Sequence, residues 1–278
     1  MISQLTGALV RAVLVMVLIA TPSLMLPHVS SDTTQIVALV ALFAAALTFF
    51  EYASTYPGLV EFRDAPPFNR LRFLSLFVTV ILLSTIVRGQ TEPTTLTEFI
   101  AALGDKLGEV IDVPYSPVRL VVLMLPEDMS TRHLIMVRTS AGIAYMISML
   151  TLILFVVVMR MIGWPSRIGT FNVWINLPTF DPTTGGDVVD RLQRDARFNI
   201  ALGFLLPFLI PAAVKLASLA FSPVTLESPQ TLIWTMTAWA FLPASLFMRG
   251  IAMGRIAGMI EAKRRQNNVS AGVELLPA

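Results

Sequence analysis

The stretch TSAGIAYMISMLTLILFVVVM, residues 139–159, decides the fold class of this chain. It has no charged side chain, and its length matches the roughly 20 apolar residues that an α-helix needs to cross a bilayer core. Similar runs recur along the sequence. Hydrophobic residues make up 55% of the chain and charged residues 14%, against about 25% charged residues in soluble domains. With a mean hydropathy of +0.73, the chain has too few polar residues for a globular surface. We therefore predict an all-α polytopic membrane helical bundle.

The other apolar runs extend this prediction to six transmembrane helices. Their expected ranges are 5–26, 35–56, 71–87, 139–159, 198–221 and 231–248. Residues 1–265 are expected to form a single membrane-embedded domain, and residues 266–278, which show no periodic pattern, a mobile C-terminal tail. The first run lacks a charged n-region and a small-residue cleavage site, so we expect a retained helix rather than a signal peptide.

Basic residues near the ends of the spans predict the orientation. The connections 27–34 and 222–230 contain no Lys or Arg, whereas 57–72 and 160–197 are rich in Arg. The segment after the last span is also basic. Because basic loops favour the cytoplasmic side, we expect both termini in the cytoplasm and the chain in a bacterial inner membrane.

The long connection 88–138 predicts two helices outside the spans. Thr95 and Glu98 form a capping-box pattern, and apolar residues follow at helical spacing as far as residue 111. This pattern predicts an amphipathic surface helix. The stretch 116–125 opens with Ser-Pro, a typical helix start, but its apolar run is too short to cross a bilayer. It predicts a short helix that is either interfacial or re-entrant.

Two loops on the predicted cytoplasmic side combine aromatic and basic residues. One lies within PGLVEFRDAPPFNRLRF, residues 57–73, and the other follows residue 162. The second is too rich in aromatic residues for a disordered linker. These loops either fold over the end of their own bundle, with arginines near lipid phosphates, or form a docking surface for another protein. On the docking hypothesis, the contact residues are Phe62, Arg63, Phe68, Arg70, Trp164 and Trp174.

Glycine and proline spacing predicts features of helix packing. Gly250, Gly254 and Gly258 lie four residues apart on one helix face, a spacing that lets two helix backbones approach closely. Their partner is expected either inside the bundle or in another subunit. Pro207 and Pro211 predict a bend in the fifth span, a feature that is also common in helices lining transport sites.

The sequence shows no catalytic or metal-binding pattern. Arg11, Glu51 and Lys215 lie near the ends of spans, where long side chains reach the headgroups, and Arg11 and Glu51 lie on the same side and are able to pair. His28 and His133 have no ligand motif around them, and cysteine is absent. We therefore expect a protein that is not an enzyme, uses no metal or cofactor and binds no nucleic acid.

Two functions remain open at this point. The first is a non-catalytic accessory or assembly subunit that docks to a larger membrane protein complex. Its partners are expected to be other membrane protein subunits, together with anionic lipid headgroups at the cytoplasmic face. The alternative is a transporter or permease subunit for a neutral or lipid-like substrate, built around the bent fifth span.

Overall fold

The computed structural model describes residues 2–63, 65–165, 176–181, 185–221 and 223–274. In these ranges all regular structure is α-helical, which confirms the predicted fold class. Helices long and apolar enough to span a membrane occur six times, as expected. They are α1 (Ile2–Met25), α2 (Ser31–Ala53), α3 (Pro66–Arg88), α6 (Thr131–Ile162), α8 (Val188–Ala217) and α9 (Pro229–Glu274).

Several of these helices are longer than the apolar runs that predicted them, because capping residues rather than hydropathy set their starts. The Ser130 hydroxyl accepts a hydrogen bond from the His133 amide, and α6 therefore begins well before residue 139. Asp187 caps α8 in the same way through the Val189 amide. At the other end of the chain, α9 continues to Glu274, so residues 266–274 extend the last helix.

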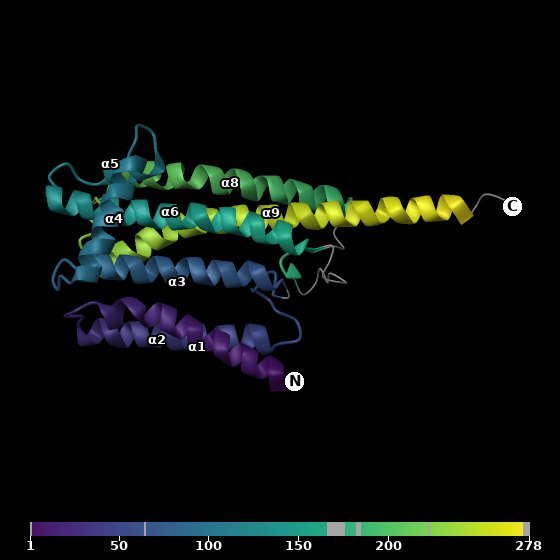
Figure 1. The fold of residues 1–278 in the computed structure, drawn as a ribbon, viewed down its shortest axis with the longest axis horizontal. Helices are drawn as coiled ribbons and strands as arrows, with labels where there is room; N and C mark the ends of the chain where they lie inside the picture. Colours follow the sequence, from purple (N-terminus) through teal and green to yellow (C-terminus); the bar gives the residue numbers. More distant parts are fainter. Residues whose placement is uncertain (1, 64, 166–175, 182–184, 222, 275–278) are drawn as a thin grey trace.

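The long helices run side by side, and both termini lie at the same end of the molecule (Figure 1). The segments that follow α2 and α6 lie at this end too, and we call it the terminal end. α8 and α9 form the most extensive pair, and α6 packs on α3 and α9. α2 is peripheral, because among the described elements it packs against α1 alone.

The three glycines on this face of α9 differ in how closely they approach α8. A Cβ added at Gly250 would lie 2.7 Å from the Ala196 carbonyl oxygen of α8, so only glycine permits this approach. At Gly254 the nearest described atom is the Ala196 Cβ, at 3.8 Å. Gly258 meets no described atom within 4 Å. The predicted glycine face therefore closes against α8 at its first position and opens toward its last.

The amphipathic helix α4 (Thr95–Ile111) crosses the other end of the bundle (Figure 1). Its capping box is formed by Thr94 and Thr97, one residue before the predicted pair of Thr95 and Glu98. The Thr94 hydroxyl accepts from the Thr97 amide at 3.2 Å, and the Thr97 hydroxyl accepts from the Thr94 amide at 2.8 Å. The prediction was wrong by one position because threonine fills both roles here, whereas the pattern requires Glu or Gln at the second.

A close backbone crossing holds α4 on α6. A Cβ at Gly142 of α6 would lie 2.7 Å from the Gly108 Cα of α4. The small side of α4 is therefore buried, and large apolar residues such as Leu96, Phe99 and Val110 face outward. The short helix α5 (Pro117–Met124) also forms as predicted, and it buries Val118 and Val121 against neighbouring helices.

The prolines of the fifth span face the bundle. Pro211 has no amide hydrogen and so leaves the Pro207 carbonyl without its usual helical donor. The Trp239 indole Nε1 of α9 donates to that carbonyl at 3.1 Å. Pro207 and Pro211 are both buried. This part of α8 therefore belongs to the α8–α9 interface.

Candidate functional site

The loop between α2 and α3 is fixed by a carboxylate in a ring of backbone amides. Glu51 Oε2 accepts hydrogen bonds from the amides of Gly58, Leu59 and Val60, at 3.0, 2.9 and 3.0 Å. Successive amides that converge in this way form an anion-binding nest. Glu51 therefore does not form the ion pair with Arg11 that the sequence allowed.

The aromatic residues that we expected to dock onto a partner lie inside the chain's own core. Phe62 and Phe68 are 0% and 1% exposed, and their ring centroids are 4.3 Å apart. Trp164 is also buried, with its ring 6.1 Å from that of Phe62. The Phe62 amide donates to the Asn176 carbonyl at 2.7 Å, which ties the α2–α3 loop to the segment between α6 and α8. These contacts hold Phe62 at φ 53°, a left-handed conformation that is uncommon for a bulky residue.

The other predicted docking residues are placed differently. Arg63 is half-buried and donates from Nη1 to the Ser54 carbonyl at 2.6 Å. Arg70 is exposed near the start of α3. Trp174 lies outside the described residues. The structure therefore brings Phe62, Phe68 and Trp164 together as packing residues and leaves Arg70 on the surface.

An ion pair connects the same loop to α9. Glu61 accepts from Arg249 Nε at 2.6 Å and from Arg249 Nη2 at 2.8 Å, which is the two-pronged geometry that arginine favours with carboxylates. Arg249 Nη1 also donates to Asn199 Oδ1 of α8 at 3.1 Å. The side chains of Glu61 and Arg249 are 14% and 27% exposed. One half-buried cluster thus joins the α2–α3 loop, α8 and α9.

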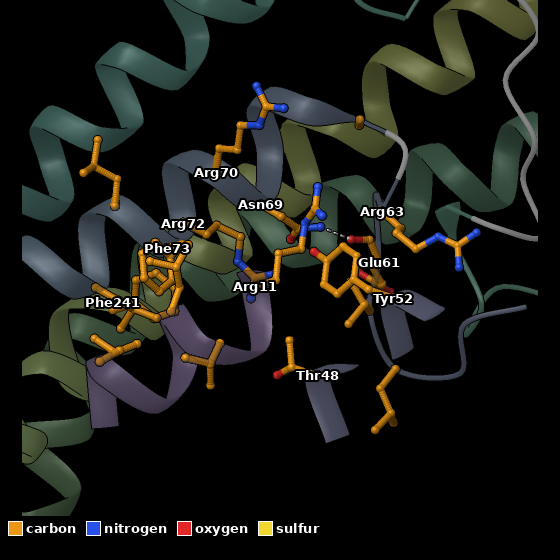
Figure 2. A pocket seen from close by; sticks show the side chains of 18 residues that line it. Arg11, Thr48, Tyr52, Glu61, Arg63, Asn69, Arg70, Arg72, Phe73 and Phe241 are labelled. Carbon is orange, nitrogen blue, oxygen red and sulfur yellow. Dashed lines mark hydrogen bonds between the residues drawn. The ribbon is translucent and has the colours of Figure 1, made fainter. Parts of the chain in front are cut away.

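A partly open cavity of about 780 Å³ lies beside this cluster, between α1, α2 and α3 (Figure 2). It exists because α2 packs against α1 without also packing against α3. On α1 the lining positions are spaced three and four residues apart, so they form one helix face. The lining residues include Arg11, Leu14, Val15, Leu18, Thr48, Tyr52, Val60, Phe73, Leu76 and Phe241. The volume falls in the range of small-molecule sites, about 300–1,000 Å³.

The walls of the cavity are largely apolar, but its charged lining residues are mainly basic. The basic residues are Arg11, Arg63, Arg70 and Arg72. Among the described lining residues, Glu61 carries the one carboxylate, and that carboxylate is already bound to Arg249. The charged end of the cavity therefore presents an excess of positive charge.

Arg72 is the most informative of these residues. Its guanidinium lies 5.4 Å from the ring centroid of Phe68 and 5.8 Å from that of Phe241. Its buried Nε has no hydrogen-bond partner, and no described carboxylate forms an ion pair with it. A cation–π contact contributes about 0.5–2 kcal/mol. Removal of an ion from water costs several kcal/mol, so the two rings alone do not compensate the cation.

Arg11 is positioned at the mouth of the cavity. Its guanidinium lies 4.6 Å from the ring centroid of Tyr52, and its Nη1 donates to the Gly7 carbonyl at 2.7 Å. In Figure 2, Arg11 and Tyr52 lie next to each other, and Arg72 lies on the α3 side. Tyr52 of α2 therefore holds the side chain of Arg11, which comes from α1.

Sequence reasoning did not identify this site. It treated Arg11 as a residue near a span end and assigned no role to Arg72 or Tyr52. The available signal was weak: Arg11 and Tyr52 lie at similar depth in adjacent spans, and Arg72 lies inside the apolar third span. The gap between the three helices depends on how they pack against one another. The hydrophobic periodicity of a sequence carries no information about such packing.

No protein-family model, curated protein or solved structure matches this chain.

Proposed function

We propose that the protein binds an amphiphilic molecule from the bilayer in the cavity between α1, α2 and α3, as a non-catalytic carrier or permease component. The observation that carries this proposal is the cavity, which combines apolar walls from membrane-spanning helices with a polar end. A molecule with an acyl portion and a polar head matches both parts. This is the lipid-like substrate of the alternative function, at a different place from the expected bent fifth span.

Molecules in the bilayer are able to reach the cavity, because its walls come mainly from membrane-spanning helices. Leu14, which lines the cavity, is 40% exposed. The peripheral position of α2 leaves the space between α2 and α3 without a helix-to-helix seal. An amphiphile is able to enter there without disrupting the main bundle.

Photolabelling tests the proposal directly. The purified protein in lipid vesicles is exposed to a phospholipid with a diazirine in its acyl chain, and the labelled peptides are identified by mass spectrometry. We expect labels to concentrate on the cavity-lining segments of α1, α2 and α3. Leu14→Trp fills the cavity and is expected to reduce that labelling severalfold, since a bulky side chain excludes the acyl chain from the same space.

Leu9→Trp is the matched control. Leu9 lies on the same helix, is similarly exposed and does not line the cavity. The proposal fails if label is spread evenly over all lipid-facing helices, or if Leu14→Trp and Leu9→Trp label alike.

The accessory-subunit role is a second candidate, supported by the peripheral packing of α2, whose outer surface is available to another subunit. Of the residues expected to dock, the exposed Arg70 is best placed to act without affecting the fold. Extraction from the native membrane in mild detergent would reveal a stoichiometric partner, and Arg70→Ala is expected to weaken its retention. Recovery of the protein by itself would count against this role.

A further inference from the structure

We propose that the basic end of the cavity binds the anionic headgroup of a membrane phospholipid, with Arg72 as the principal contact and Arg11 at the mouth. This inference rests on the proposed function, because it assigns the chemistry of the amphiphile's polar end. It adds a charge requirement that an apolar cavity alone does not impose.

The state of Arg72 is the first argument. A guanidinium carries five N–H donors and no acceptor, and it stays charged in proteins. Here its Nε is buried without a partner, and the nearby carboxylate of Glu61 is engaged by Arg249. The rings of Phe68 and Phe241 cover the guanidinium but offer no hydrogen-bond acceptor. The missing group is an anion with oxygen acceptors, and phosphate has the geometry that arginine binds best.

The depth of Arg72 is the second argument. It lies five residues after Pro67, where the apolar span begins. At 1.5 Å per residue this places its Cα about 8 Å along the helix. The headgroup region of a bilayer is several ångströms thick on each side of the hydrocarbon core. Arg72 therefore lies in the first turns of the span, where its long side chain is able to reach a headgroup phosphate.

The continuity of the lining favours a lipid over a free anion. From the basic end, the walls continue along α1 through Leu14 and Leu18 and along α3 through Leu76. A free phosphate would use only the basic end and leave this apolar space unexplained. A phospholipid uses both parts at once, with its phosphate at Arg72 and an acyl chain along the leucines.

The experiment compares two diazirine phospholipids with identical acyl chains, one with the anionic glycerol headgroup and one with zwitterionic choline. Each is added in trace amount to vesicles of neutral lipid that contain the purified protein. Both probes carry a phosphate, but the choline cation is repelled by the basic residues that line this end of the cavity. We therefore expect the anionic probe to label the cavity segments about tenfold more than the choline probe. Arg72→Gln is expected to remove this preference while labelling by the choline probe continues, and Arg72→Lys to keep part of it.

Arg88→Gln is the matched control, because Arg88 lies at the opposite end of α3 and pairs with Glu92. It is expected to leave the preference unchanged. If Arg72→Gln does not give a folded, monodisperse protein, Arg11→Gln serves as the second variant, since Arg11 is exposed at the mouth and its removal leaves the core packed.

The outcomes separate this inference from the proposed function. Equal labelling by the two probes, or an anionic preference that survives Arg72→Gln and Arg11→Gln, overturns the headgroup assignment while labelling of the cavity still supports amphiphile binding. Failure of both probes to label the cavity overturns the two proposals together. Complete displacement of the anionic probe by inorganic phosphate identifies a free-anion site and overturns the lipid assignment.

Discussion

At the scale of single residues, the α2–α3 loop is held by charges that find partners on distant elements. Glu51 binds the amides of its own loop, whereas Glu61 binds Arg249 near the other end of the sequence. Arg72 differs from both, since no described residue supplies it with an anion. Glu51 and Glu61 therefore stabilise the fold, whereas the charge of Arg72 is the one that we propose binds a ligand.

The Glu61–Arg249 pair is expected to be a main stabilising contact of this end of the bundle. Glu61→Gln removes the charge from a pair that is less than a third exposed, and hydrogen bonds to charged groups contribute about 1.5–3 kcal/mol. We expect a clear fall in the midpoint of thermal unfolding in detergent. Glu92→Gln breaks the more exposed Arg88–Glu92 pair, and its expected cost is below about 1 kcal/mol. Equal midpoints of thermal unfolding for Glu61→Gln and Glu92→Gln would show that the Glu61–Arg249 pair is not a main stabilising contact.

The aromatic residues of the loop show why residue type alone did not decide between packing and docking. Phe and Trp dominate both protein cores and interface hot spots, so the pattern favoured neither. The structure buries Phe62 and Phe68, and the truncation Phe68→Ala is consequently a test of stability rather than of partner binding. Exposed Arg70 remains a meaningful probe of docking.

At the scale of helices, small residues set the closest approaches. The Gly250 contact with α8 and the Gly108–Gly142 crossing both leave no room for a Cβ. The first lies on a glycine repeat that was visible in the sequence. The second joins two helices that are far apart in the chain, and no local pattern shows which glycine meets which.

Matched glycine substitutions test this description. Gly250→Ala is expected to destabilise the protein, because the new methyl group would lie 2.7 Å from the Ala196 carbonyl oxygen and force α8 and α9 apart. Gly258→Ala meets open space and is expected to be neutral or to stabilise by up to about 1 kcal/mol through helix propensity. Thermal unfolding of both variants in the same detergent provides the measurement. A Gly258 variant that is less stable than the Gly250 variant would show that the repeat packs elsewhere.

Helix positions were predictable from the sequence to a large extent, while helix ends were not. The apolar runs located each membrane-length helix that the structure describes, because the bilayer imposes both length and hydropathy on a span. The early start of α6 and the late end of α9 depend on polar residues outside the membrane region, where hydropathy carries no information. The cavity was missed for a related reason, since it arises from the absence of α2–α3 packing.

At the scale of the whole molecule, the arrangement predicts which segments share a compartment. The chain has no cysteine, so single-cysteine variants report one position each. Thr55 follows α2 and Lys263 belongs to the last part of α9, and both of these segments lie at the terminal end, whereas Glu127 follows α5 at the other end. All three residues are exposed. We expect Glu127→Cys to react with an impermeant maleimide added to intact cells, whereas Thr55→Cys and Lys263→Cys react only after lysis. The opposite pattern would invert the predicted orientation, and a mixed pattern would contradict the six-span arrangement.

The contact between Glu61 and Arg249 also has a consequence for how the protein is made. The two residues are separated by 188 positions, so the ribosome must synthesise almost all of the intervening chain before the pair is able to form. At about 5–20 residues per second this takes roughly 10–40 s. During that interval the loop behind the first two helices is able to bind Glu51 but still lacks its contact with Arg249. The α2–α3 loop therefore gains its contact with Arg249 only when the last helix is made. A nascent chain stalled before residue 249 is expected to expose this loop to proteases and chaperones.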